Sequence, residues 1–175
     1  MPIIVEFEGR LPRIAASAFI APNATIVGDV EIADNVSIWF GAILRGDFAP
    51  IRIGRNCNIQ DNVVAHAESR ETGLVLEENV TVGHSAILHG ELIEKGCLIG
   101  MGAILLSGSV IGAGSMVAAG SVVREYCKIP PNCLAAGNPA EVKKALQGNA
   151  ARWAANAADI YAGLAQRYKA DQKRE

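Results

Sequence analysis

The large aliphatic residues of this chain recur at steps of six along most of its length. A period of six matches neither the 3.6-residue period of a helix nor the alternation of a plain strand. It fits a short strand followed by a tight turn, so that three repeats close one triangular coil of about 18 residues. The repeated positions, all Ile, Leu or Val except one alanine, are Ile20, Ile26, Ile32, Ile38, Leu44, Ile53, Ile59, Ala65, Leu76, Val82, Leu88, Ile93, Ile99, Leu105, Ile111, Val117 and Val123.

A second set, of small or β-branched residues, usually lies four residues after the large aliphatic one. Its members are Ala24, Val30, Val36, Ala42, Cys57, Val63, Val80, Ala86, Cys97, Ala103, Ser109, Ser115 and Ser121. We expect the large side chains to stack from coil to coil and fill a thin prism, with the small residues near its corners. Neighbouring coils pair their backbones at about 4.8 Å, and no coil is stable alone. The pattern therefore predicts an all-β solenoid, a parallel β-helix of hexapeptide repeats.

Two segments break the six-residue step, and the C-terminal part follows a different pattern. At 48–52 and 68–75 we expect loops that leave the prism, and such insertions often build the binding face of a solenoid. After Val123 the repeat decays, and apolar residues then recur at helical spacing. We therefore expect a β-helix domain at 1–137 and a helical segment at 138–175 that packs along it. The expected packing stripe is Trp153, Ala157, Ile160, Leu164 and Tyr168.

Composition narrows the possible functions. The chain has 175 residues with 50% hydrophobic but only 5% aromatic residues, which suits a narrow core. Sixteen basic against eighteen acidic residues argue against a nucleic-acid partner. No apolar run approaches the roughly 18 residues of a membrane span, and no secretory signal is evident. The four cysteines lack CxxC spacing and read as free thiols, so we expect a reducing, cytoplasmic setting.

The three histidines, His66, His84 and His89, are the strongest candidates for chemistry. Counted in hexads, Arg45, His66 and His89 occupy the same position on three successive coils. His66 and His89 should therefore lie one strand spacing apart, which suits two imidazoles on one ion. His84 lies on another face, in a ladder with Asp61, so it should reach the pair only from a neighbouring copy, as in a cyclic homotrimer. Three imidazoles with an open fourth position are typical of catalytic zinc, whereas the plainer interpretation is three unrelated surface histidines.

Polar residues that a prism does not need surround these histidines. Arg45 and Asp47 stand at the top of the His66 ladder. An ion pair between Arg45 and Asp61 across the subunit boundary would follow from the two ladders. Glu68, just beyond His66, could carry protons or simply face water. The remaining candidates are Asn58 and Gln60 beside the His84 ladder, and for all of these residues an ordinary solvated turn is the alternative.

Several segments resemble the gamma-class carbonic anhydrase family. The resemblance covers about residues 10–168 and rests on four motifs, Leu44-Arg45-Gly46-Asp47, Asn58-Ile59-Gln60-Asp61, Val82 to Gly90, and Ile99 to Ala103. It implies a left-handed β-helix, a homotrimer, and a metal at each subunit interface, usually zinc, with iron or cobalt in some members. By the same resemblance His66, His84 and His89 match metal ligands, Gln60 the residue that orients the reacting water, Arg45, Asp47 and Asp61 an ion network, and Asn58 and Tyr161 further active-site residues. Glu68 is offset from the family's proton-carrying glutamate, whose place Ser69 takes, and the shortened loop predicts slow turnover.

The leading hypothesis is therefore reversible, metal-dependent hydration of CO2 to bicarbonate. A second hypothesis is acyl chemistry, as a hexapeptide acyltransferase or an acyl-CoA thioesterase. A transferase would need one histidine as general base and no metal. The third is a trimeric scaffold that binds metal with little or no catalysis. Metal content separates hydration or a metal-dependent thioesterase from a transferase. The scaffold predicts bound metal, no turnover, and dissociation of the oligomer on chelation.

Overall fold

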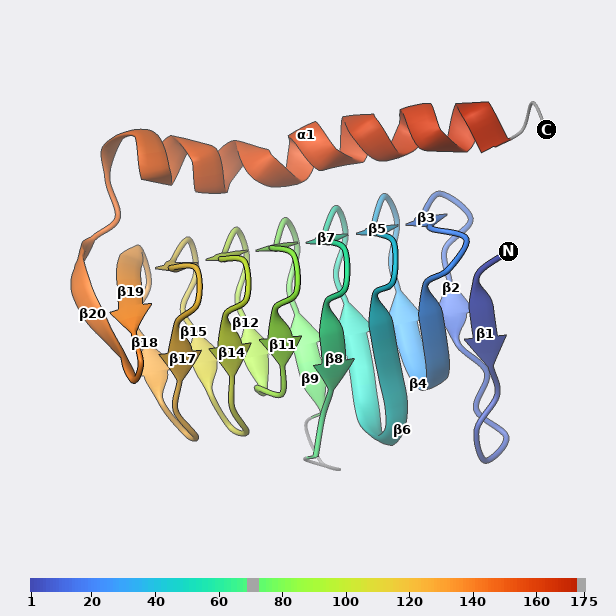
Figure 1. The fold of residues 1–175 in the computed structure, drawn as a ribbon, viewed down its shortest axis with the longest axis horizontal. Coiled ribbons are helices and arrows are strands. Elements are labelled where there is room, and N and C mark those ends of the chain that lie inside the picture. The colour runs from blue at the N-terminus through green and yellow to red at the C-terminus, as the bar shows by residue number, and fades with distance from the viewer. Residues whose placement is uncertain (69–72, 173–175) are drawn as a thin grey trace.

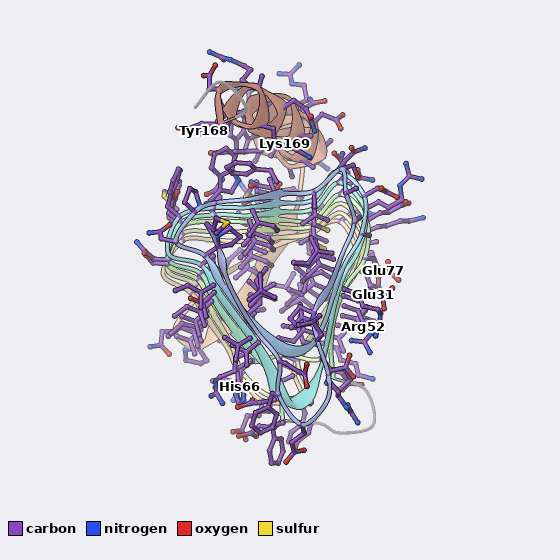
Figure 2. All side chains as sticks on the ribbon, turned by 90° about the vertical axis from the view of Figure 1, so that its right-hand side faces the viewer. Glu31, Arg52, His66, Glu77, Tyr168 and Lys169 are labelled. Atoms are coloured by element: carbon purple, nitrogen blue, oxygen red, sulfur yellow. The ribbon has the colours of Figure 1, made fainter. Side chains whose placement is uncertain are left out.

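The computed structural model describes residues 1–68 and 73–172. The chain forms a left-handed parallel β-helix with three faces, and one long helix, α1 (Gly148–Gln172), runs along one face from the C-terminal coils back toward the N-terminal ones (Figure 1). Viewed down the axis, the coils superpose as a triangle with the helix above its upper side (Figure 2). The solenoid that the six-residue repeat predicts is confirmed, and so is the C-terminal helix that the later helical spacing predicts.

The face beneath the helix, here called the helix-covered face, is a sheet of two-residue strands extended by one hairpin. In spatial order its strands are β3 (Phe19–Ile20), β5 (Ser37–Ile38), β7 (Asn58–Ile59), β10 (Thr81–Val82), β13 (Leu98–Ile99), β16 (Met116–Val117), β19 (Cys133–Gly137) and β20 (Ala140–Ala145). All pairs are parallel except β19 with β20, which is antiparallel. The hairpin covers the last coil, where a parallel stack would otherwise leave an open edge.

The other two faces form one continuous sheet because two long strands, β4 (Thr25–Ile32) and β6 (Ile43–Ile53), bend around the corner between them. What we call the second face contains the first halves of β4 and β6 together with β1 (Ile3–Val5), β8 (Val64–His66), β11 (Ile87–Leu88), β14 (Ile104–Leu105) and β17 (Val122–Val123). The third face contains their second halves with β2 (Arg13–Ile14), β9 (Leu74–Leu76), β12 (Leu92–Ile93), β15 (Val110–Ile111) and β18 (Lys128–Ile129).

The continuity of β6 corrects one expectation. The break in the hexad at 48–52 was expected to be a loop outside the prism, but these residues belong to β6. They stay in the sheet because Ile51 and Arg52 pair with β4 on one side and with β9 on the other. The second expected loop, 68–75, rejoins the sheet at Leu74, and residues 69–72, including Ser69, lie outside the described residues.

The core follows the hexad closely. Every repeated aliphatic position is buried except Ile20, and so is every small residue four positions later. The residue just before the small one, at the corner of the coil, is usually Asn or Gly with a positive φ. Most other residue types are disfavoured in this left-handed conformation. Two exceptions are Ser85 (φ 59°) and Tyr126 (φ 57°). The six-residue repeat thus indicates both which residues are buried and where the chain turns.

The C-terminal segment differs in detail from the expectation. The predicted helical segment at 138–175 starts with the strand β20, and the helix itself begins only at Gly148. The predicted packing stripe is wrong for Trp153 and Ile160, each of which is 51% exposed. Alanines form the buried side of the helix instead, and their small size lets the helix lie close to the sheet. They are Ala154, Ala157, Ala158 and Ala165.

Aromatic and polar contacts anchor the far end of α1. The ring of Tyr168 lies 5.3 Å from that of Trp39 and 5.7 Å from that of Phe19, between the helix and the helix-covered face (Figure 2). The Lys169 ammonium donates to the carbonyls of residues 16, 17 and 18 at 2.9 to 3.1 Å. These contacts fix the C-terminal end of the helix over the N-terminal coils, those of β3 and β5.

Two global expectations can be compared with the described residues. None of the four cysteines is in a disulfide, which confirms free thiols. In the described part of the chain, no helix has both the length and the apolar character needed to cross a membrane.

Candidate metal centre

The corner between the second and third faces, here called the histidine corner, brings Arg45, His66 and His89 together. Arg45 pairs with His66 in register between β6 and β8, and His89 follows β11 one coil further on. His66 points outward at this corner, on the side of the triangle away from the helix (Figure 2). His66 Nδ1 and His89 Nε2 lie 3.3 Å apart. The predicted vertical pair of imidazoles is thus present within one chain.

Each ring of this pair is held through its other nitrogen. His66 Nε2 lies 3.1 Å from a carboxylate oxygen of Asp47, and His89 Nδ1 lies 2.9 Å from the hydroxyl of Ser107. A carboxylate only accepts hydrogen bonds, so neutral His66 carries its proton on Nε2 and keeps the Nδ1 lone pair free. Such partners on the outer nitrogen orient an imidazole toward a metal.

Ser107 sets the tautomer of His89 in the same way. Its hydroxyl donates to a carboxylate oxygen of Glu68 at 3.2 Å, so it accepts the hydrogen bond from His89 Nδ1–H. His89 Nε2 therefore keeps its lone pair, and this atom faces His66. The other Glu68 oxygen lies 3.9 Å from His89 Nε2, and the Glu68 side chain is 62% exposed. Sequence reasoning missed Ser107, although its place on the coil directly after His89 was a usable signal.

Arg45 and Asp47 form an ion pair within the same chain at this corner. Burial alone raises the pKa of Asp47, but the hydrogen bonds from the Arg45 guanidinium and the Phe48 N–H outweigh it. The pKa of Asp47 therefore lies below its usual value, and the carboxylate stays ionised as the acceptor for His66. The expected pair of Arg45 with Asp61 of a neighbouring copy stays a prediction.

The corner between the helix-covered and second faces, here called the helix corner, carries the other candidates. His84 Nδ1 lies 2.8 Å from a carboxylate oxygen of Asp61, which leaves its Nε2 lone pair free. The His84 backbone N–H donates to Gln60 Oε1 at 3.1 Å. Tyr161 of α1 packs edge-on against Trp39 and lines the same cavity as Gln60 and His84. The chain therefore groups Gln60, Asp61, His84 and Tyr161 at a corner different from that of His66 and His89.

Asn58 lies apart from both corners. It is fully buried beneath α1, where its Oδ1 accepts hydrogen bonds from the Trp39 indole at 2.6 Å and the Ser37 hydroxyl at 3.2 Å. Asn58 Nδ2 has no hydrogen-bond partner within the described residues. In this chain Asn58 therefore anchors the helix-covered face, and an active-site role for it stays a prediction.

Comparisons with known proteins identify the family of this chain. The model of the bacterial transferase hexapeptide family (six repeats) matches residues 12–46 and 92–125. A carbonic anhydrase from Geobacillus kaustophilus is 46% identical over 171 residues, which cover 98% of this chain and 93% of that protein. The mitochondrial gamma carbonic anhydrase 1 of Arabidopsis thaliana is 41% identical over 93% of this chain, which spans 61% of the plant protein. The chain belongs to the gamma-class carbonic anhydrase family.

Solved structures extend the likeness to proteins described as transferases. A Bacillus cereus protein provisionally classed as an acetyltransferase has a TM-score of 0.93 and 42% identity, and covers 97% of this chain and 98% of its own. A hexapeptide transferase family protein from Anaplasma phagocytophilum has a TM-score of 0.89 and 37% identity, over 95% and 98% of the two chains. Family membership is thus compatible with more than one function, and the geometry of the site has to decide between them.

The donors at the histidine corner fit the zinc that is typical of the gamma-class family. Two nitrogens bound tetrahedrally at about 2.0–2.1 Å lie about 3.3–3.4 Å apart, and His66 Nδ1 and His89 Nε2 are 3.3 Å apart. Within residues 1–68 and 73–172 of a single chain, no three His, Cys, Asp or Glu side chains converge to hold a metal. If three side chains hold the ion, at least one of them comes from outside the described residues of a single chain.

The second face joins the two corners through an apolar surface. The outward-facing side chains of its central strands, Ile43, Val64 and Ile87, are 37 to 41% exposed. They lie in register on β6, β8 and β11, one above the other. An in-register apolar stripe with polar ladders on both sides is suited to packing against another protein surface.

Proposed function

We propose that this protein is a metal-dependent catalyst of the reversible hydration of CO2 to bicarbonate. The observation that carries the proposal is the pair of imidazole nitrogens 3.3 Å apart, each ring held through its outer nitrogen by Asp47 or Ser107. The similarity to named carbonic anhydrases supports the same reaction. The four free cysteines fit the cytoplasmic setting that the sequence predicts.

The proposed site is shared between subunits of a homotrimer. His66 and His89 of one chain would provide two ligands, and His84 of the next chain the third. In support, His84 keeps a free Nε2 lone pair at the opposite edge of the apolar second face. A surface that offers one edge to the opposite edge of the next copy closes into a ring when the rotation between copies permits it, and a ring of three copies would have three equal sites. Arg45 and Asp61 would then meet across the same boundary.

The chemistry divides between the ion and the side chains. When bound, zinc supplies a Lewis acid that allows water to ionise near neutral pH, and iron or cobalt could serve in its place. Gln60 Oε1 is already engaged by the His84 N–H, so its amide NH2 is left to orient the attacking hydroxide or a CO2 oxygen. Glu68 accepts a hydrogen bond from Ser107 and is largely exposed, which supports a role in passing the released proton to solvent.

The test is CO2 hydration by the purified, zinc-loaded protein, followed as proton release in a stopped-flow instrument. We expect His89→Ala to lose nearly all activity, because it removes one of two adjacent donors. Ser109→Ala is the matched control, since the Ser109 hydroxyl is buried and has no hydrogen-bond partner in the described structure. Equal rates for the wild type and His89→Ala would remove the proposal.

Acyl transfer or thioester hydrolysis is the second candidate, supported by the Bacillus cereus and Anaplasma structures that carry transferase descriptions. A transferase that uses one histidine as a base predicts activity without metal. Elemental analysis of the native oligomer separates the candidates: about one metal per chain favours hydration or a metal-dependent thioesterase, and metal-free activity favours transfer. Bound metal without turnover in any assay would indicate the scaffold role.

A further inference from the structure

A cavity of about 350 Å³ lies between α1 and the helix-covered face. It spans the coils of β10, β13 and β16, which pair in register, so it extends over two strand spacings, or about 10 Å. Its volume falls within the range of small-molecule binding sites. CO2, with three heavy atoms, leaves most of such a space unfilled.

The cavity is polar at one end and apolar at the other. Gln60, Thr81 and His84 lie at the β10 end. Leu98 and Met116 continue along the axis in register with Thr81, and the other apolar walls include Met101, Ala118 and Trp153. Met101 and Trp153 are 58% and 51% exposed, so large apolar groups face solvent at this cavity.

The polar end contains an unmet hydrogen-bonding group. Thr81 is 3% exposed, lines the cavity, and its hydroxyl has no partner among the described residues. A buried polar group without a partner costs about 1–3 kcal/mol, so the Thr81 hydroxyl favours a ligand whose oxygen can accept its hydrogen bond.

The charge of the lining narrows the ligand further. No Lys or Arg is among the residues that line the cavity. A carboxylate would be buried there without a cation, which is costly, whereas a neutral carbonyl needs only hydrogen-bond donors. The apolar walls beyond the donors suit an aliphatic chain attached to that carbonyl.

We propose that this cavity binds a neutral acyl compound, with its carbonyl oxygen at Thr81 and its aliphatic chain along Leu98 and Met116. The inference rests on the proposed function only in treating His84 as part of the reacting corner. Ligand binding itself needs neither the metal nor catalysis. The proposal therefore extends the ligands of this corner from CO2 to carbonyl compounds with an apolar tail.

Methionine methyl groups allow a direct test. The chain has three methionines, of which Met101 and Met116 line the cavity and Met1 does not. In metal-free protein labelled with ¹³C at the methionine methyls, methyl hexanoate should shift the signals of Met101 and Met116 and leave Met1 unchanged. Methyl butanoate should bind about tenfold more weakly, because two fewer methylenes are buried. Hexanoate anion should bind more weakly than its ester.

Two variants separate binding from folding. Thr81→Val removes the unpartnered hydroxyl, so it should keep or raise the unfolding midpoint while ester binding weakens about threefold to tenfold. Ala118→Leu fills the cavity and should abolish the shifts, while Ala136→Leu, at the same position one coil further on, should keep them. Unshifted signals of Met101 and Met116 at saturating ester, or equal binding by Ala118→Leu, would overturn the inference. Neither outcome would bear on CO2 hydration, which is measured separately.

Discussion

The hydrogen bond between Ser107 and His89 provides a sharp test of the proposed metal centre. In Ser107→Ala, His89 Nδ1 loses its acceptor at 2.9 Å, and Glu68 loses the donor at 3.2 Å. His89 is then free to place its proton on Nε2, the atom that faces His66. The change leaves both proposed metal ligands of this corner in place, so it tests orientation and not donor identity.

The size of the effect follows from the role of such partners. Removal of a hydrogen-bond partner behind a ligand typically costs 10–100-fold in metal affinity. This corresponds to about 1.4–2.7 kcal/mol at 25 °C. Because His89 is only one of the proposed ligands and Asp47 still holds His66, we expect a value near the lower end. CO2 hydration at saturating zinc should fall less than zinc affinity does.

Zinc affinity is measured by competition with a chromophoric chelator, and the His89 tautomer by ¹⁵N chemical shifts of the metal-free protein. Ser107→Ala should weaken zinc binding about tenfold and shift His89 toward its Nε2–H form. The control is again Ser109→Ala, a serine-to-alanine change two residues away. If Ser107→Ala binds zinc as tightly as the control and keeps the Nδ1–H tautomer, the assignment of Ser107 as a positioning residue is wrong.

Three further predictions rest on single residues. Ser85 occupies a left-handed corner where adjacent coils carry Asn or Gly, so Ser85→Asn should raise the free energy of unfolding by up to about 1 kcal/mol in urea titrations. The Arg52 guanidinium lowers the pKa of Asp29, so this pair stabilises the fold above about pH 4 and less as the pH falls through the lowered pKa. Asp29→Asn should thus lower the urea midpoint more at about pH 7 than at about pH 2, and an equal loss at both would contradict the pairing. Burial raises the pKa of Cys57 and Cys97 to about 12, so a thiol reagent at about pH 8 should modify the other two cysteines first, as read by mass spectrometry.

Much of the fold could be predicted because one period encodes both packing and turns. The six-residue step identifies the buried aliphatic positions, and only Ile20 departs from it. The buried side of the helix was harder to predict, because it consists of alanines, which are less hydrophobic than the exposed Trp153 and Ile160. A break in the repeat also does not show whether the chain leaves the sheet. At 48–52 the extra residues belong to a strand that bends around a corner.

At the site, strand register could be predicted from the sequence, whereas individual side-chain contacts could not. Register places His66 beside His89 and His84 beside Asp61, and both pairs are found. Sequence reasoning missed the Ser107 contact, because a corner serine has the same appearance as the small residues that merely fit there. A five-residue step after Leu88 brings the His89 corner close to the next coil, where the backbone N–H groups of residues 91 and 92 both donate to the Ser109 carbonyl.

The geometry of a β-helix explains why this corner offers two ligands and not three. Adjacent positions in a ladder are about 4.8 Å apart, and tilted rings bring two of their nitrogens to tetrahedral spacing, here with an angle of 41° between the ring planes. A third residue in the same ladder would be two spacings, or about 9.6 Å, from the first, which is far beyond the edge of a zinc tetrahedron. In this chain that position holds Arg45, which pairs with Asp47 instead. In the proposed homotrimer a further imidazole would approach from the side, across the apolar second face, where an identical prism would present its His84.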